Sequence, residues 1–299
     1  MEDGIIDIIK AKGPMTGSEL EKISGGDPLL LLRVCRLSDK LSIRTIGTRY
    51  LRFDRNIEGY ARLSPSILRE FLTYSVIGLT DDPGPIEKRA LEIESNIERI
   101  SRAKSNLAYN IVSSLMDRFE YDLQERICFI IAGDIVFNMA HDVPRPERST
   151  GKMVKGSDMD IVVIVDDQFP ERQKDRLDEE IYKEKFSLLL NPYMKEEIDY
   201  IVKDISRVKE QVKFKTFKHM VACKILHEGT LLFGSEDIFH TIKSLLREEG
   251  VYEKIDTLER SAVEFRLKAE NYLLKEDIKK IKKDSYHLFY PTEESEEFE

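Results

Sequence analysis

Two aspartates stand two residues apart at the start of an apolar run. Asp158 and Asp160 lie just before residues 161–165, five β-branched apolar residues that are typical of a strand buried on both faces. Because successive strand side chains point to opposite faces, the two carboxylates project the same way. Paired hard oxygen ligands beside solvent suit a magnesium ion that carries substrate phosphates. The spacing therefore predicts a metal site at the mouth of this strand.

The competing interpretation of an Asp-x-Asp pair is a loop end followed by a solvated strand position. In this chain the residues that follow are apolar, and an unpaired carboxylate beside low-dielectric surroundings costs free energy. A cation partner for Asp160 is therefore favoured over the solvated alternative.

Further strands and helices are predicted around this pair. An apolar run at 127–132 ends at Gly133, and residues 135–140 continue in a helical pattern. A glycine between strand and helix lets the backbone approach a phosphate, and the helix N-terminus supplies free N–H donors. Residues 172–190 have apolar side chains at helical spacing, and 198–202 form a third short strand with a carboxylate inside it.

The order strand, glycine, helix, Asp-x-Asp strand, helix and Asp strand resembles the nucleotidyltransferase superfamily. That superfamily includes DNA polymerase β, antibiotic nucleotidyltransferases and the minimal nucleotidyltransferases of toxin–antitoxin pairs. The resemblance covers roughly residues 126–236. Ala132-Gly133 are similar to the start of the first family motif, Ser157-Asp158-Met159-Asp160-Ile161 to its Ser-Asp-x-Asp-apolar signature, and Asp199 to its third carboxylate. Residues 226–235 are similar to the hairpin-like segment that follows the catalytic strands in the minimal enzymes.

The resemblance implies a magnesium-dependent enzyme that transfers a nucleoside monophosphate from a nucleoside triphosphate, with ATP expected, to an acceptor hydroxyl and releases pyrophosphate. It implies two magnesium ions held by the catalytic residues Asp158, Asp160 and Asp199. The first two would hold the ion bound to the triphosphate, while Asp199 would complete the second position and take the proton of the acceptor. Glu197 lies on the same strand face as Asp199 and competes for this third role.

One residue departs from the family pattern. Asp134 stands where a small hydroxyl residue would help to hold the triphosphate, and a carboxylate there repels phosphate unless a metal or a basic residue intervenes. The insertion at 141–155 contains Arg145 and other basic residues, which either face the phosphates as a flexible lid or lie on a solvated surface loop. The expected nucleotide-binding residues are Gly133, Asp134, Ser157, Arg148, Lys152 and Lys155.

Residues 1–55 have the order of a winged helix-turn-helix domain, in which three short helices precede a β-hairpin. Thr16 and Glu19 form a capping-box pattern at the second helix, Asp27 begins the third, and residues 41–53 are predicted to form the hairpin. A local excess of arginine in the third helix and the hairpin predicts contact with duplex DNA, and a protein-docking module is the alternative. The expected DNA-binding residues are Arg33, Arg36, Arg44, Arg49 and Arg52.

The predicted fold class is α+β, and four parts are expected along the 299 residues. They are an N-terminal winged helix-turn-helix, a helical linker, a nucleotidyltransferase domain with a mixed sheet and flanking helices, and a C-terminal helical region with an acidic tail. Their predicted boundaries are 1–60, 61–125, 126–240 and 241–299. The long helical pattern at 86–126 suits either packing on the transferase domain or a homodimer interface.

Composition and cysteine spacing indicate the cellular compartment in which the protein is expected. The net charge is -9, and the three cysteines have no paired spacing, which argues against a disulfide framework or a zinc site. No apolar run approaches membrane-spanning length, and the acidic N-terminus lacks the basic start of a signal peptide. A cytoplasmic protein without a membrane partner is therefore expected.

Three functions agree with these features. The first is an active nucleotidyltransferase that carries a DNA-binding winged helix. The second is a DNA-binding transcriptional regulator whose inactive transferase domain senses a nucleotide, an interpretation that Asp134 favours. The third is an antitoxin-like enzyme that modifies a partner protein and represses its own operon. A nucleic-acid end, a protein hydroxyl or a small molecule would all suit as the acceptor. Across the three functions, the expected partners are a nucleotide, duplex DNA and a protein acceptor.

Overall fold

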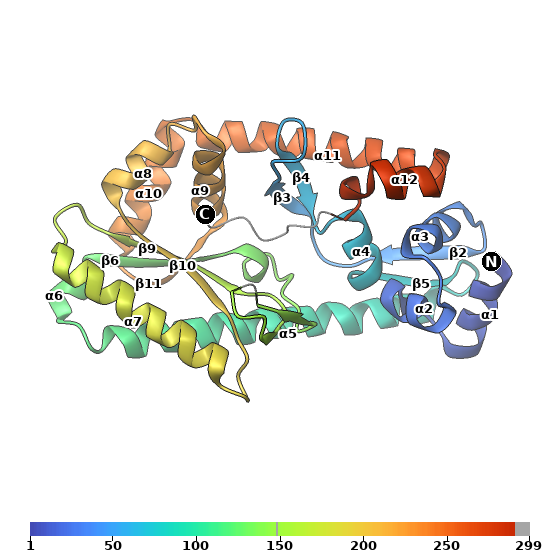
Figure 1. Cartoon of the computed structure of the whole chain (residues 1–299), viewed down its shortest axis with the longest axis horizontal. Helices are drawn as coiled ribbons and strands as arrows, with labels where there is room; N and C mark the ends of the chain where they lie inside the picture. The colour runs from blue at the N-terminus through green and yellow to red at the C-terminus, as the bar shows by residue number, and fades with distance from the viewer. Residues whose placement is uncertain (148, 291–299) are drawn as a thin grey trace. The chain divides into compact units, whose positions relative to one another are not determined.

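The computed structural model describes residues 1–147 and 149–290, which divide into two compact units. The first unit contains residues 1–96 and 256–290, and the second contains Ile97–Ile255. Helices α5 (Pro83–Met116) and α11 (Val251–Lys275) are continuous, and each begins in one unit and ends in the other. Both units combine helices with sheets, so the predicted α+β class is confirmed in general terms (Figure 1).

The second unit is built on a four-stranded mixed sheet. Its strands are β6 (Ile127–Ala132), β9 (Met159–Val165), β10 (Ile198–Asp204) and β11 (Thr230–Gly234). Their order is β10-β9-β6-β11, with β9 and β10 parallel and the other two pairs antiparallel. The three strands predicted from apolar runs are thus present as neighbours in one sheet.

Helices cover both faces of this sheet (Figure 1). One face carries α5 and α7 (Glu171–Leu190), and the other carries α8 (Ile205–Gln211), α9 (Phe217–Glu228) and α10 (Glu236–Glu248). Short helix α6 (Tyr121–Gln124) precedes β6. All residues of β6 and β9 are buried, because a strand with helices on both faces has no solvated side.

The main core of the second unit lies between the sheet and the helices α5 and α7. Alternate strand residues such as Phe129, Ile161 and Val163 pack there with Val112 of α5 and Leu177 of α7. Side chains at the positions between them point to the opposite face, where α8, α9 and α10 lie. The predicted helix at 172–190 is confirmed as α7.

The helix predicted directly after Gly133 is wrong. The chain forms a single 3₁₀ turn, η1 (Gly133–Ile135), and then continues without regular helix. Asn138 has a φ of 54°, in the left-handed region that a right-handed helix does not contain. The loop after β6 therefore approaches the end of β9 as a tight turn and does not present a helix N-terminus.

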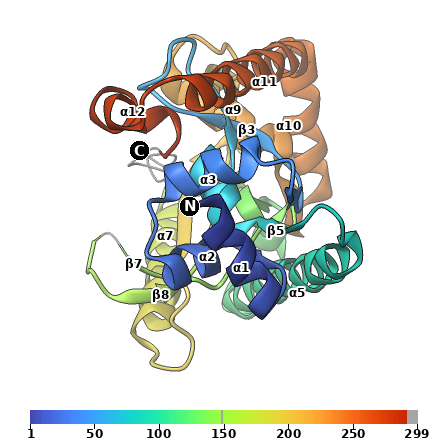
Figure 2. The same cartoon turned by 90° about the vertical axis from the view of Figure 1, so that its right-hand side faces the viewer.

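The first unit begins with a three-helix cluster (Figure 2). Its helices are α1 (Glu2–Lys12), α2 (Gly17–Ser24) and α3 (Pro28–Leu37). The predicted capping box is confirmed: the amide of Glu19 donates to Thr16 Oγ1 at 3.2 Å, and the amide of Thr16 donates to Glu19 Oε2 at 2.7 Å. Asp27 caps α3 through the amide of Leu30.

The hairpin predicted within 41–53 is wrong in its pairing. Strand β2 (Leu41–Thr45) pairs with β5 (Ser75–Leu79), which lies between β1 (Met15–Thr16) and β2. Strand β3 (Tyr50–Phe53) pairs instead with β4 (Ala61–Ser64). Strand β2 pairs with β5 because β5 is apolar, and its central residues are fully buried in the middle of a three-stranded sheet.

The predicted linker at 61–125 is therefore only partly helical. It contains the strands β4 and β5, with helix α4 (Ile67–Thr73) between them, before α5 begins. The aliphatic residues of 67–79 allow either helix or strand by pattern alone, since short apolar runs do not distinguish the two. In the described residues, no helix has the length and apolarity that crossing a membrane requires.

C-terminal elements complete the core of the first unit. Helix α12 (Ile278–Asp284) and the 3₁₀ turn η2 (Tyr286–Leu288) follow α11. Leu273, Ile281 and Phe289 pack in one cluster with the apolar face of α3. Helix α3, which the sequence predicts to be the DNA-recognition helix, thus packs against C-terminal residues.

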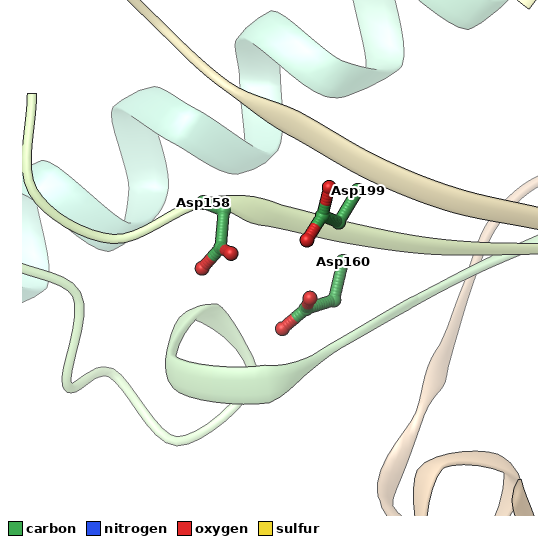
Figure 3. A group of neighbouring side chains, drawn as sticks. All are labelled: Asp158, Asp160 and Asp199. Atoms are coloured by element: carbon green, nitrogen blue, oxygen red, sulfur yellow. The ribbon is translucent and has the colours of Figure 1, made fainter. Parts of the chain in front are cut away.

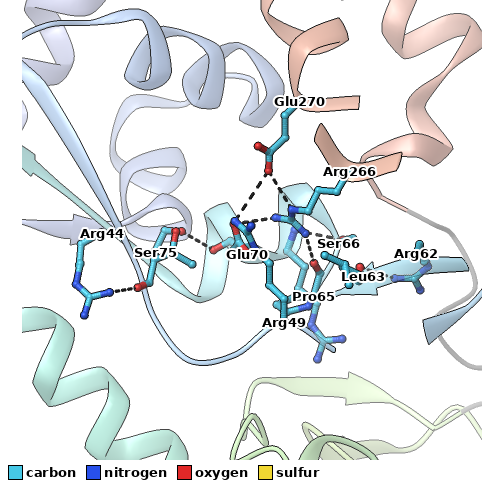
Figure 4. A network of polar contacts seen from close by, with 12 residues as sticks. Arg44, Arg49, Arg62, Leu63, Pro65, Ser66, Glu70, Ser75, Arg266 and Glu270 are labelled. Carbon is cyan, nitrogen blue, oxygen red and sulfur yellow. Dashed lines mark hydrogen bonds and ion pairs between the residues drawn. The ribbon is translucent and has the colours of Figure 1, made fainter. Parts of the chain in front are cut away.

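A buried ion-pair network joins α4 to α11 inside the first unit (Figure 4). The guanidinium of Arg266 is 2.8 Å from Glu70 Oε1 and 2.9 Å from Glu270 Oε1, and it donates to the carbonyl of Pro65 at 2.7 Å. Arg49 forms a second pair with Glu70 at 2.6 Å. The side chains of Arg266 and Glu70 are each 4% exposed, so removing one charge leaves the other desolvated.

We expect Arg266→Met to lower the free energy of unfolding by about 3 kcal/mol, because Glu70 keeps its burial and loses one of its two counter-charges, with Arg49 remaining at 2.6 Å. The matched control is Arg44→Met, which breaks the exposed Arg44–Glu87 pair and should cost less than about 1 kcal/mol. Urea denaturation followed by circular dichroism measures both values. Equal losses in the two variants would show that the network does not stabilise the unit.

Candidate active site

Three aspartates converge at one end of the four-stranded sheet (Figure 3). Asp158 directly precedes β9, Asp160 is the second residue of β9, and Asp199 is the second residue of β10. Asp160 and Asp199 are partners in the parallel register, so their side chains share a face of the sheet. One carboxylate oxygen of each residue lies within 4.8 Å of the others. The structure therefore brings together the three residues that the sequence assigned to the metal site.

The donor set of this carboxylate triad fits a hard divalent cation. Carboxylate oxygens are the ligands that magnesium prefers, and three of them converge here. Partial burial in the site raises the pKa of Asp158, and the negative charges of Asp199 and Asp134 raise it further against the opposing effect of Arg145. A bound divalent cation would relieve the repulsion that favours the protonated form.

Gly133 borders the triad from the loop after β6. Its φ is +72°, and a Cβ atom at this position would lie 2.0 Å from Asp160 Oδ2. Asp134 follows it and accepts a hydrogen bond of 2.8 Å from Ser157 Oγ. Ser157 in turn accepts from the amide of His141 at 3.2 Å. Of the expected nucleotide-binding residues, Gly133, Asp134 and Ser157 therefore lie around the triad.

The insertion at 141–155 forms a β-hairpin, with β7 (Pro144–Pro146) paired to β8 (Met153–Lys155). The ammonium of Lys155 donates to the carbonyl of Tyr193 at 3.0 Å, and Lys152 is exposed in the hairpin turn. Arg148 lies outside the described residues. Neither of these two lysines pairs with the triad, so their roles in nucleotide binding stay predictions.

Arg145 is the basic residue that this hairpin delivers to the site. Its guanidinium lies 3.4 Å from Asp158 Oδ2 and 2.9 Å from Glu197 Oε2, and its Nε donates to the carbonyl of Gly156 at 2.7 Å. The sequence showed a cluster of basic residues here but gave no signal for which of them reaches the carboxylates. Arg145 therefore supplies positive charge beside Asp158 of the triad.

Glu197 and Asp199 occupy different positions. Asp199 joins the triad, whereas Glu197 is buried beside Arg145. Burial raises the pKa of Glu197 to about 7, although Arg145 opposes this shift. The structure thus places Asp199 and not Glu197 with Asp158 and Asp160, as the leading sequence assignment expected.

Two further lysines near the site were missed by sequence reasoning. The ammonium of Lys185 on α7 lies 2.8 Å from Asp199 Oδ1. Lys104 on α5 is buried, donates to the carbonyl of Lys155 at 2.8 Å and pairs with Glu196. Lys104 lies 51 residues before Lys155, and Lys185 lies 14 residues before Asp199 on a separate helix; no spacing pattern links either lysine to the site.

The arginines predicted to bind DNA have partners within the first unit. Arg36, Arg44 and Arg49 form ion pairs with Glu270, Glu87 and Glu70. The guanidinium of Arg33 donates to the carbonyls of Leu273 and Glu276 at the end of α11. Arg52 lies on β3 opposite Arg62. Contact between these arginines and DNA stays a prediction, and the packing of α11 against α3 counts against it.

The geometry of the triad predicts that Gly133→Ala weakens binding of a divalent cation. The new Cβ would displace Asp160, so we expect Mn²⁺ affinity to fall by about tenfold or more, as measured by isothermal titration calorimetry. The matched control is Gly151→Ala, because Gly151 also has a positive φ of +67° but has no atom near the added Cβ. Similar affinities in the two variants would contradict the close approach of Gly133 to the metal site.

Residues 148–223 match a family model described as “Nucleotidyltransferase domain”. The matched segment contains the carboxylate triad and the strands β9 and β10 that hold it. No curated protein and no solved structure gives a significant match to this chain. The family match supports nucleotidyl transfer as the general activity of this part of the chain.

Proposed function

We propose that the second unit is a magnesium-dependent nucleotidyltransferase that moves a nucleoside monophosphate from a nucleoside triphosphate to an acceptor hydroxyl. The observation that carries this proposal is the convergence of Asp158, Asp160 and Asp199 at the ends of two parallel strands, inside the segment that matches the family model. Three carboxylates at one point are costly unless a cation is bound, and a cation that also binds phosphate gives the cluster a function.

In this proposal Asp158 and Asp160 would hold the magnesium of the nucleotide, with ATP as the expected nucleotide, and Asp199 would complete a second metal position. Bound magnesium would supply charge neutralisation at the phosphates. Asp199 accepts the proton of the acceptor hydroxyl, whose oxygen forms a bond to the α-phosphorus. The bond from the α-phosphorus to the bridging oxygen breaks, and that oxygen leaves with pyrophosphate.

The other side chains of the site position these groups. Lys185 fixes Asp199 through a contact of 2.8 Å, and Arg145 fixes Asp158 from the hairpin side. Gly133 allows the loop after β6 to approach Asp160 closely, so its backbone would lie beside a phosphate of the nucleotide and beside the carboxylates that would hold the metal. Alignment of the reactants and neutralisation of charge then provide most of the acceleration.

We expect Asp160→Asn and Asp199→Asn each to lower pyrophosphate release by about 100-fold or more, with an unchanged circular dichroism spectrum. The assay is incubation with each labelled nucleoside triphosphate and magnesium, in which label on the protein or on an added acceptor is measured together with pyrophosphate. Asp237→Asn is the matched control, since Asp237 is an exposed residue in the first turn of α10. Full activity in both active-site variants would exclude the proposed roles.

The alternative is a regulator whose transferase domain binds a nucleotide without turning it over. Asp134 favours this function, because its carboxylate adds negative charge to the site and accepts a hydrogen bond from Ser157 where a phosphate would need donors. A sensor would bind nucleotide and magnesium but release no pyrophosphate. The DNA-binding part of this alternative depends on the first unit, where α3 is packed against C-terminal residues.

The variant Asp134→Ser separates the two functions. In an active enzyme it should leave transfer intact or raise it, because a hydroxyl repels phosphate less than a carboxylate does. In a sensor the unmodified protein should show nucleotide binding without pyrophosphate, and the variant should recover a trace of activity. A complete loss of transfer with the fold intact would instead make Asp134 a catalytic ligand, against both functions.

A further inference from the structure

A carboxylate is held at the backbone amide that borders the triad. The amide of Gly133 donates to Glu228 Oε1 at 3.3 Å. The ammonium of Lys224, one turn earlier on α9, lies 2.9 Å from both carboxylate oxygens of Glu228. The side chains of Lys224 and Glu228 are 4% and 6% exposed. A backbone N–H and a buried ammonium thus converge on one anionic group.

The position of Glu228 is fixed by the turn between α9 and β11. The ammonium of Lys243 donates to the carbonyls of Leu226, His227 and Gly229, at 2.7, 2.7 and 2.8 Å. These carbonyls flank Glu228 on both sides, so Lys243 holds the backbone that carries it. Gly229 packs so closely on β6 that an added Cβ would lie 2.4 Å from the side chain of Ile130. The contacts of Lys243 and Gly229 therefore fix the backbone position of Glu228.

The donors that hold Glu228 are those that bind phosphate. Backbone amides at a glycine turn and lysine ammonium groups are common ligands of phosphate oxygens in proteins. The turn in question is the one after β6, and the same Gly133 lies against Asp160 of the triad. A phosphate oxygen bound in place of the Glu228 carboxylate would therefore lie next to the candidate metal site.

We propose that Glu228 is an internal anion that occupies a phosphate subsite formed by the amide of Gly133 and the ammonium of Lys224. The ligand of this subsite is a phosphate group of a nucleoside triphosphate, which binds when Glu228 moves away. The inference rests on the proposed function and adds two residues to it: Lys224 as a phosphate ligand and Glu228 as its competitor. Glu228 sets how much free energy a nucleotide must supply to enter the site.

The competing explanation is a structural salt bridge within α9. A buried Lys–Glu pair contributes little net stability, because desolvation of both charges offsets their attraction. The two explanations differ when the negative charge alone is removed. If the pair is only structural, neutralising Glu228 leaves the Lys224 ammonium uncompensated and does not strengthen phosphate binding. If Glu228 competes with phosphate, neutralising it leaves the subsite vacant with Lys224 in place, and phosphate binds more tightly.

The experiment measures binding of magnesium tripolyphosphate to the full chain by isothermal titration calorimetry. This probe has the phosphates of the nucleotide but no base, sugar or acceptor. We expect Glu228→Gln to bind it about tenfold more tightly than the unmodified protein, because the competing charge is lost and the side-chain shape is kept. The double variant Lys224→Met/Glu228→Gln should lose this gain, since it lacks the cation.

A second variant and a control complete the test. Glu228→Asp keeps the charge but withdraws it by one methylene, so it should also bind the probe more tightly than the unmodified protein, and it serves if Glu228→Gln does not fold. Glu249→Gln, in an exposed pair with Lys213, should not change binding. Unchanged or weaker binding by the Glu228 variants, or a gain that persists without Lys224, would overturn the inference.

The outcome also separates this inference from the proposed function. If the unmodified protein transfers a nucleotide but the Glu228 variants bind tripolyphosphate no better, only the internal-anion inference fails. If the variants bind tripolyphosphate more tightly and no nucleotide is transferred under any condition, the subsite stands and the transferase proposal fails.

Discussion

Repulsion among clustered carboxylates is the constraint on which the rest of the second unit depends. The three aspartates place ligand oxygens within 4.8 Å of one another, a distance at which two unit charges repel by about 3.5 kcal/mol at an effective dielectric constant of about 20. The protein offsets this cost with cations from separate elements: Arg145 from the β7–β8 hairpin beside Asp158, and Lys185 from α7 beside Asp199. Each pairs with a different acidic side chain. The charge that they leave on the triad is the charge that a divalent cation would neutralise.

The sequence predicted the parts of this site that depend on local pattern. Strand side chains alternate strictly, so the spacing of Asp158 and Asp160 was sufficient to place both on one face, and the apolar run after them was sufficient to bury the strand. The same alternation left Glu197 and Asp199 equivalent. The family resemblance favoured Asp199, and the register of β10 against β9 together with the position of Arg145 beside Glu197 agrees with that assignment.

The predictions that failed depended on contacts between distant residues. The turn signal within 41–53 predicts a local hairpin, yet β2 pairs with β5, which begins 30 residues after β2 ends, because β5 is apolar enough to be the central strand. The helix after Gly133 was predicted from the local pattern of residues 135–140, and the left-handed backbone of Asn138 excludes it. No local pattern indicates that Leu273 and Phe289 pack with α3, since that contact joins opposite ends of the chain.

The central claim is that Asp158, Asp160 and Asp199 form one metal–nucleotide site. Anomalous diffraction from a crystal soaked with Mn²⁺ and a non-hydrolysable nucleoside triphosphate tests it most directly, because the metal is located without reference to activity. The account predicts an anomalous peak within bonding distance of carboxylate oxygens of Asp158 and Asp160, with phosphate oxygens completing the coordination and Asp199 beside it. A nucleotide bound elsewhere, or manganese located away from the triad, would contradict it.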